Sequence, residues 1–186
     1  DARWDARPPP CAPGRGIIPA VDSRWEAMPE DIDLLIEKLK HPSEIIRKEA
    51  CRDLGKLQEK AAVRPLIELL KDPSKAVRDN AAFALGELQD KRALEALVES
   101  VLKDTESWVR KSAAKALGLL GDRRAEDALI SAMSDDADWA RKSAARALGQ
   151  IGSKKSADVL RQATQDPSVL VRKHAREALE RIERSA

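Results

Sequence analysis

Residues 108–118 read WVRKSAAKALG, and residues 139–149 read WARKSAARALG. Three further segments align with these two: IIRKEACRDLG at 45–55, AVRDNAAFALG at 76–86 and LVRKHAREALE at 170–180. Each segment carries one arginine at its third position, and these arginines follow one another after 31, 32, 31 and 31 residues. Self-similarity at a fixed period is the signature of a repeat protein. The sequence therefore predicts five tandem repeats.

Each repeat is expected to hold two helices. A second apolar pattern precedes each segment: LLIEKL at 34–39, PLIELL at 65–70, ALVESVL at 96–102, ALISAM at 128–133 and VLRQA at 159–163. Between the two patterns, Asp-Pro pairs at 72–73 and 166–167 suggest an aspartate N-cap followed by proline at the first helical position. A Leu-Gly pair near the end of the first four segments indicates a tight exit and close packing of the next repeat. We predict an all-α solenoid with a period of about 31 residues.

The chain divides by composition into a tail and a repeat domain. Residues 1–28 are rich in Pro and Gly and are predicted to be a tail, and residues 29–186 are predicted to form the repeats, at 31–60, 61–91, 92–123, 124–154 and 155–184. Met28 resembles a natural initiator, so the stretch ahead of it is interpreted as a leader, with a processed transit segment as the alternative. Glu180 replaces the glycine in the fifth repeat, which predicts a polar cap there.

The repeat pattern D-P-x-x-x-V-R-x-x-A-A-x-A-L-G resembles the short HEAT-like repeat named after the phycobilisome lyases, over about residues 31–184. The resemblance implies the solenoid fold. It says little about function, because such repeats occur in chromophore lyase subunits, in a metal-dependent hydroxylase and in many binding scaffolds. The hydroxylase branch holds iron with paired His-Glu motifs, and the two histidines of this chain, His41 and His174, do not form them.

A variable surface is expected beside a constant core. Relative to the repeat arginine, positions −1, +3, +4 and +7 form an apolar stripe, whereas positions −2, +1, +2 and +5 vary between repeats and are predicted to line a concave face. We call these varying positions of the second helices the variable face. Its candidate partner-binding residues are Phe83, Trp108, Lys111, Lys115, Trp139, Lys142, Arg146, Leu170, Lys173 and His174.

The three aromatic residues of the repeats, Phe83, Trp108 and Trp139, all fall on the variable face. Exposed tryptophans are frequent anchors of interfaces, and the lysines around them predict a basic, aromatic groove for an acidic protein segment. The alternative is that the tryptophans only cover the turn between helices. Trp108 and Trp139 occupy the same position in adjacent repeats, so they are expected within about 10 Å of each other.

A ladder of ion pairs is expected from the constant residues. In similar repeats the arginine binds the turn aspartate of a neighbouring unit. The matching residues here are Arg47, Arg78, Arg110, Arg141 and Arg172, with Asp72, Asp104, Asp135 and Asp166. His41 replaces the aspartate in the first repeat, so the ladder is expected to break at its first rung. We interpret these arginines as structural rather than phosphate-binding, because constancy through all repeats serves stacking.

Function is expected to be non-catalytic. No phosphate-binding glycine loop, nucleophile elbow or zinc-ligand spacing appears in the sequence, and no cofactor is expected. The formal charge of +2 disfavours nucleic acid as the partner, and the absence of a long apolar run argues against a membrane span. Cys11 and Cys51 are interpreted as free thiols, which fits a cytoplasmic or other reducing compartment. We expect a protein-binding scaffold, with a phycobilin lyase subunit and a nucleic-acid-binding module as alternatives.

Overall fold

The computed structural model describes residues 32–184, and this part of the chain contains ten α-helices. The first helices of the five pairs are α1 (Ile32–Lys38), α3 (Val63–Glu68), α5 (Leu94–Lys103), α7 (Glu126–Ala132) and α9 (Lys154–Ala163). The second helices are α2 (Glu44–Leu57), α4 (Lys75–Leu88), α6 (Ser107–Leu120), α8 (Asp138–Ile151) and α10 (Val169–Arg184). These residues contain no strand. Their remaining regular elements are four 3₁₀ turns, η1 (Lys60–Ala62), η2 (Leu69–Lys71), η3 (Lys91–Ala93) and η4 (Arg123–Ala125).

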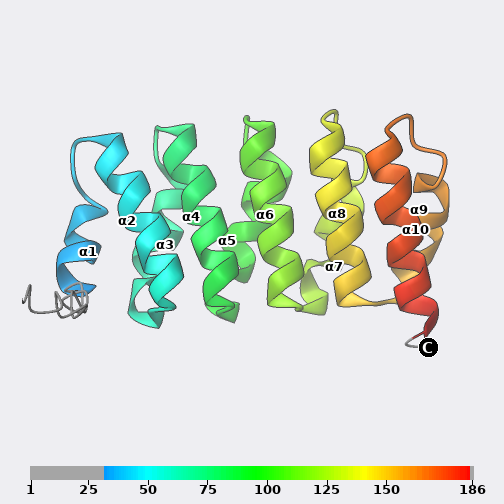
Figure 1. Cartoon of the computed structure of the whole chain (residues 1–186), viewed down its shortest axis with the longest axis horizontal. Helices are drawn as coiled ribbons and strands as arrows, with labels where there is room; N and C mark the ends of the chain where they lie inside the picture. The colour runs from blue at the N-terminus through cyan, green and yellow to red at the C-terminus, as the bar shows by residue number, and fades with distance from the viewer. Residues whose placement is uncertain (1–31, 185–186) are drawn as a thin grey trace, which may run out of the picture. The chain divides into compact units, whose positions relative to one another are not determined.

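The helix pairs follow one another in sequence order along a row (Figure 1). The even-numbered helices lie side by side in one layer, and each packs on the next, while the odd-numbered helices form the layer behind them. The predicted all-α solenoid is confirmed. Each predicted repeat range holds one pair, except that α9 begins one residue early, at Lys154. The predicted tail and its boundary at residue 28 lie outside the described residues.

The second helices begin later than the Asp-Pro signal predicts. Asp72 is not the N-cap of α4, because α4 starts at Lys75 after Ser74. The Asp72 carboxylate instead closes a small turn, in which its Oδ1 accepts a hydrogen bond of 2.8 Å from the backbone amide of Ser74. The same turn recurs at Asp104, Asp135 and Asp166. One carboxylate oxygen is thereby fixed to the backbone while the carboxylate stays available to a neighbour.

Small side chains let the second helices approach closely. The predicted core stripe is buried in the central repeat, where Val109, Ala113, Ala114 and Leu117 are fully inaccessible. The first helices contribute larger side chains to the same core, including Leu97 and Leu129, and both are fully buried. The described residues thus share one continuous apolar core that runs through all five repeats.

The repeat glycines allow close contact between neighbouring helices and do not end their own helices. The second helices continue past them, so that Gly118 lies within α6, which ends at Leu120. A Cβ atom at Gly118 would lie only 2.9 Å from the Cβ of Ala147 in α8 and 3.0 Å from its Cα. Equivalent glycine–alanine contacts join the other neighbours: Gly55 with Ala84, Gly86 with Ala116, and Gly149 with Ala178. We call these four pairs the glycine–alanine contacts.

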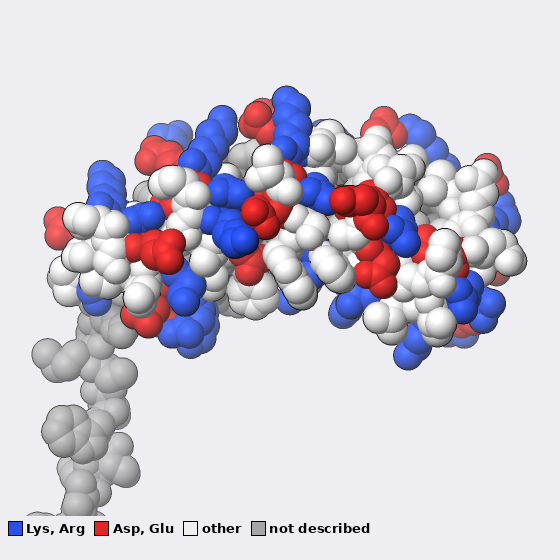
Figure 2. Space-filling view, turned by 90° about the horizontal axis from the view of Figure 1, so that it is seen from above, with Lys and Arg blue, Asp and Glu red and all other residues white. Residues whose placement is uncertain are grey.

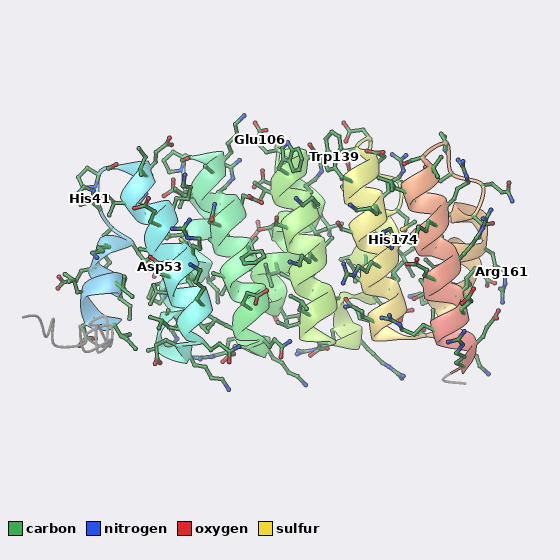
Figure 3. All side chains as sticks on the ribbon, in the orientation of Figure 1. His41, Asp53, Glu106, Trp139, Arg161 and His174 are labelled. Atoms are coloured by element: carbon green, nitrogen blue, oxygen red, sulfur yellow. The ribbon has the colours of Figure 1, made fainter. Side chains whose placement is uncertain are left out.

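The two ends of the row depart from this pattern. In the fifth repeat, the glycine position holds Glu180, whose side chain is exposed. In the first repeat, the alanine position holds Asp53, which is labelled in Figure 3. The last repeat also carries the exposed Arg176 where the inner repeats bury alanine. Both ends therefore present charge where the inner repeats present small side chains, as terminal repeats require.

Seen from above, the repeat unit bends so that the side of the second helices is hollow (Figure 2). Cationic and acidic side chains alternate along the edge that this view shows. None of the helices in residues 32–184 combines the length and apolar composition needed to cross a membrane. The hollow side is the side that carries the variable face.

Candidate functional site

The repeat arginines and turn aspartates form bidentate ion pairs between neighbouring repeats. Arg47 donates from Nε to Asp72 Oδ2 at 2.7 Å and from Nη2 to Asp72 Oδ1 at 2.9 Å. The same pair of bonds joins Arg78 to Asp104, Arg110 to Asp135 and Arg141 to Asp166. Planar guanidinium and carboxylate groups match in this geometry. The second helices α2, α4, α6 and α8 are thus each tied to the turn of the following repeat.

The expected break in this ladder at His41 is wrong. Each arginine reaches forward to the next repeat, so Arg47 has its aspartate and the first rung is complete. The ladder ends instead at Arg172, which donates from Nη1 to the carbonyls of Asp166 and Pro167 as the other arginines do in their own turns. Within residues 32–184, no carboxylate accepts a hydrogen bond from Nε or Nη2 of Arg172.

The ladder residues are unavailable to an external ligand. Side-chain exposure is 15% or less for the four paired arginines and 10% or less for their aspartates. Burial of the Asp72 carboxyl acts to raise its pKa, but hydrogen bonds from Arg47 and from the Ser74 amide outweigh it, and the pKa lies below its usual value. These groups are charged, paired and enclosed, which is the arrangement of a structural tie.

The two tryptophans stack on each other at the edge of the variable face. Their ring centroids are 5.1 Å apart and their planes differ by 11°. Both rings remain accessible, since Trp108 is 53% exposed and Trp139 is 37% exposed. Figure 3 shows Trp139 at the start of α8, on the same edge of the row as Glu106, which precedes α6. The pair makes one exposed aromatic surface that spans the third and fourth repeats.

Two lysines of α6 rest on aromatic rings. Lys111 Nζ lies 4.5 Å from the ring centroid of Trp108, and Lys115 Nζ lies 4.4 Å from that of Phe83 in α4. Such cation–π contacts hold an ammonium group in place. Phe83 is 39% exposed, so the second repeat extends the aromatic surface.

A pocket of about 250 Å³ opens beside these residues. It is lined by Lys111, Lys115, Leu119, Lys142, Ser143, Arg146, Ala147, Gln150 and His174. The cations come from α6 and α8, and His174 comes from α10, where Figure 3 places it midway along the helix. The structure therefore brings five of the ten predicted partner-binding residues around one pocket, with the tryptophan pair nearby.

Leu170 and Lys173 do not line this pocket. Leu170 is 52% exposed at the start of α10. Lys173 lies within ion-pair distance of Glu177, whose carboxylate also contacts Nδ1 of His174 at 3.0 Å. In the fifth repeat, Glu177 therefore pairs with Lys173 and contacts His174. The third and fourth repeats hold a cation, Lys115 or Arg146, at the position of Glu177.

Some features of the face were not predicted. Ser112, at a variable position, is buried and donates to Asp79 Oδ1 at 2.5 Å, so this position contacts the preceding repeat rather than solvent. The Phe83–Lys115 contact was also missed. Both residues hold the same position in adjacent repeats, and this shared position would have indicated that they are neighbours. Gln150 and Leu119 lie outside the four variable positions and were overlooked for that reason.

The described residues carry no arrangement suited to metal or thiol chemistry. No group of three or more His, Cys, Asp or Glu side chains within residues 32–184 is placed to hold a metal ion. Cys51 is fully buried in the position that later repeats fill with alanine, and burial raises the pKa of its thiol to about 12. Its role is that of a small core side chain.

Comparison with known proteins identifies the repeat. The family model described as HEAT repeats matches residues 32–118 and 100–180. The chain belongs to the HEAT-repeat family. Among solved structures, it resembles a chain of the complex of CpcE and CpcF of phycocyanin lyase from Nostoc sp. PCC7120. That match has 26% identity, a TM-score of 0.75, and covers 92% of this chain and 71% of the other.

A second similar structure is a designed armadillo repeat protein in complex with the peptide (KR)4. It is 22% identical, has a TM-score of 0.66, and the match covers 81% of each chain. No curated protein sequence matches this HEAT-repeat chain. The comparisons establish a HEAT-like repeat protein of the phycobilisome-lyase type, built as a repeat scaffold.

Proposed function

We propose that this HEAT-repeat chain is a non-catalytic scaffold that binds a partner protein through the variable face of its third to fifth repeats. The observation that carries the proposal is the stacked pair of Trp108 and Trp139, which stays exposed on a charged surface. Large aromatic side chains that remain accessible are the usual energetic anchors of interfaces. The rings are also held in place by each other, so binding orders few additional side chains.

The charge beside the rings favours an acidic segment of the partner. Lys142 and Arg146 line the pocket, and no carboxylate of residues 32–184 forms an ion pair with either. A segment lying across the second helices would place apolar side chains on the tryptophan pair and carboxylates toward these cations. Electrostatic complementarity of this kind contributes specificity and association rate.

The related folds support binding rather than catalysis. The structure from Nostoc is a complex of two lyase chains, and the designed armadillo protein is in complex with a peptide. Solenoids with this arrangement of helices therefore hold other chains in known cases. An extended row of second helices offers a long contact surface without a deep active site.

Replacing both tryptophans tests the proposal. With a partner identified by cross-linking, the variant Trp108→Ala/Trp139→Ala should bind it with affinity reduced by about 2 kcal/mol or more, because hot-spot aromatic anchors are lost. Affinity is measured by titration calorimetry and helical content by circular dichroism, which should not change. The matched control is Leu34→Ala/Leu102→Ala, which removes exposed apolar side chains from the first helices.

If the tryptophans only cover the turns, the result reverses. The double tryptophan variant would then unfold at a lower temperature, while its folded fraction kept the wild-type affinity. That outcome would exclude the variable face as the binding surface.

A second candidate function is that of a subunit in a tetrapyrrole lyase. The similarity to the CpcE–CpcF complex over 92% of this chain favours it. A purified chain that retains or transfers a bilin, detected by visible absorbance, would support this candidate. A colourless chain that neither binds nor transfers added bilin, alone or with its partner, would contradict it.

A further inference from the structure

The pocket between α6, α8 and α10 gathers positive charge from the third and fourth repeats. We call it the cation pocket and define it by Lys111, Lys115, Lys142 and Arg146. His174 of α10 also lines the pocket, with its Nδ1 3.0 Å from the Glu177 carboxylate, and the other lining residues are uncharged. A site of this composition, with four cationic groups on two helices and no acid in its lining, is suited to an anion.

The cations of this pocket lack internal partners. Within residues 32–184, Lys111, Lys115, Lys142 and Arg146 form no ion pair, whereas some lysines elsewhere pair with acids of neighbouring repeats, as Lys71 does with Glu99. Lys111 and Lys115 are held by aromatic rings instead. The molecule thus keeps several cations close together without a carboxylate, although such crowding of like charges opposes folding.

A phosphoryl group suits this pocket better than a single carboxylate does. A phosphorylated side chain carries about −1.5 to −2 charge at pH 7 and three acceptor oxygens. One such group is able to accept hydrogen bonds from donors on different helices at once, which a planar carboxylate with two oxygens does less well. The guanidinium of Arg146 and the ammonium of Lys142 lie on the same wall, one helical turn apart.

The surroundings favour a phosphorylated protein over a nucleic acid. A nucleic acid would need a continuous track of phosphate-binding cations. The position that holds Lys111 and Lys142 holds Asp79 in the second repeat, and the position that holds Lys115 and Arg146 holds Phe83 there and Glu177 in the fifth. The row of cations is therefore interrupted at the second repeat, and in the fifth repeat Lys173 is paired with Glu177.

We propose that the cation pocket receives the phosphoryl group of a phosphorylated side chain in the partner segment. The proposal rests on the proposed function, because the tryptophan pair would anchor the same segment beside the pocket. Binding at this site would then depend on phosphorylation of the partner. The pocket would bind the phosphate, and the tryptophan rings would contact apolar side chains.

Inorganic phosphate provides a direct test on the full chain. In a nuclear magnetic resonance titration at pH 7.5 and constant ionic strength, phosphate should cause saturable shifts at the backbone amides of Lys142, Arg146 and His174. Acetate at the same concentrations should not. The variant Lys142→Gln/Arg146→Gln should weaken phosphate binding by roughly tenfold or more, since charge-assisted hydrogen bonds are lost. The control Lys154→Gln, which removes an exposed cation of α9, should bind as the wild type does.

The opposite results are equally clear. Shifts that grow linearly without saturation, or equal shifts with acetate, would overturn the proposal, and both comparisons use only the wild-type chain. Tighter binding of single-stranded oligothymidylate than of phosphoserine through these same amides would assign the pocket to nucleic acid and also overturn it.

Failure of the two proposals can be told apart. Loss of partner binding in the tryptophan variant together with no saturable phosphate binding would leave the scaffold proposal standing and reject the cation pocket. Saturable phosphate binding together with unchanged partner affinity in the tryptophan variant would do the reverse.

Discussion

Gly149 shows how one missing methyl group sets the distance between repeats. A Cβ atom at this position would lie 2.7 Å from the Cβ of Ala178 and 2.8 Å from its Cα, so backbone would have to move. We expect Gly149→Ala to destabilise the chain by about 1–3 kcal/mol, because overpacking outweighs the better helix propensity of alanine. Urea unfolding measures the loss.

Glu180 provides the control for this experiment. It occupies the glycine position in the last repeat and is exposed. Glu180→Ala should change the free energy of unfolding by no more than about 0.5 kcal/mol. A Gly149→Ala variant as stable as the wild type would show that the glycine–alanine contact does not limit helix approach.

The ladder predicts a pH dependence that one aspartate is able to reveal. The hydrogen bond from Arg141 lowers the pKa of Asp166 below its usual value of 3.8, although burial opposes the shift. The stability that this carboxylate contributes is therefore present above about pH 4 and is lost as the pH falls through the lowered pKa. Asp166→Asn should cost about 1.5–3 kcal/mol at pH 7, and the difference from wild type should shrink below pH 4.

Unfolding by urea between pH 3 and 7 gives this comparison. The control is Asp158→Asn, an exposed aspartate that pairs with Arg161 within one helical turn. Its replacement should cost less than about 0.5 kcal/mol at any of these pH values, as exposed ion pairs usually do. A constant difference between Asp166→Asn and wild type across the whole range would contradict an ionised rung.

At the residue scale, the sequence identified the rung partners but not their direction. The constancy of the arginines and aspartates predicted that they bind each other between repeats. Spacing of about 31 residues is the same forward and backward, so it does not tell which neighbour an arginine reaches. That is why the break was placed at His41, whereas the unmatched residue is Arg172.

At the element scale, the central repeats should carry most of the stability. Leu117 of α6 is fully buried between two neighbouring repeats, whereas Leu179 of α10 is only partly buried at the end of the row. Leu117→Ala should cost about 2–5 kcal/mol as a large-to-small core change, and Leu179→Ala should cost less. Equal losses in denaturant unfolding would argue against stability built from contacts between neighbouring repeats.

Helix number and type were predictable because the apolar period recurs in every repeat. Helix ends were not. The Asp-Pro signal placed the start of α4 at residue 73, but the Asp72 side chain bonds the Ser74 amide and delays the helix to Lys75. The glycines likewise indicated helix ends, yet they lie inside the last turn. A residue that is constant because it contacts a neighbouring repeat looks the same in the sequence as one that is constant because it begins or ends its own helix.

At the scale of the whole molecule, charge should influence the speed of binding more than its final strength. The net charge of +2 is small, so attraction of an acidic partner depends on the local cations of the variable face. Lys111→Glu/Lys142→Glu should slow association and make its rate less sensitive to salt than that of the wild type. Stopped-flow fluorescence of the tryptophans provides the rates.

The control for charge reversal is Lys91→Glu/Lys154→Glu, which changes the net charge equally but lies away from the variable face. Its association rate should stay closer to wild type. If both double variants slowed association to the same extent, the whole-molecule field rather than the variable face would be responsible.

The position of the candidate site followed from one asymmetry, a constant core stripe beside a variable stripe, which collects all three aromatic residues of the repeats. That asymmetry predicted that the tryptophans lie near each other. It also predicted a basic, aromatic groove around them, but not the bounds of the cation pocket, because these depend on how far the helices stand apart. Ser112 departs from the pattern for a similar reason: Asp79 of the preceding repeat lies close enough to accept a hydrogen bond from its hydroxyl.

The glycine–alanine contacts have a consequence for copies of the chain in concentrated solution. A row of near-identical units invites head-to-tail growth into a filament, since the last unit offers the surface that the first would fit. Here that contact would set Glu180 of one copy against Asp53 of the next and leave Arg172 facing His41 instead of an aspartate. Two carboxylates would meet where glycine meets alanine inside the row, and the added rung would lack its acid. A head-to-tail contact of this kind would therefore lack both the close helix approach and the ion pair that join repeats within the chain.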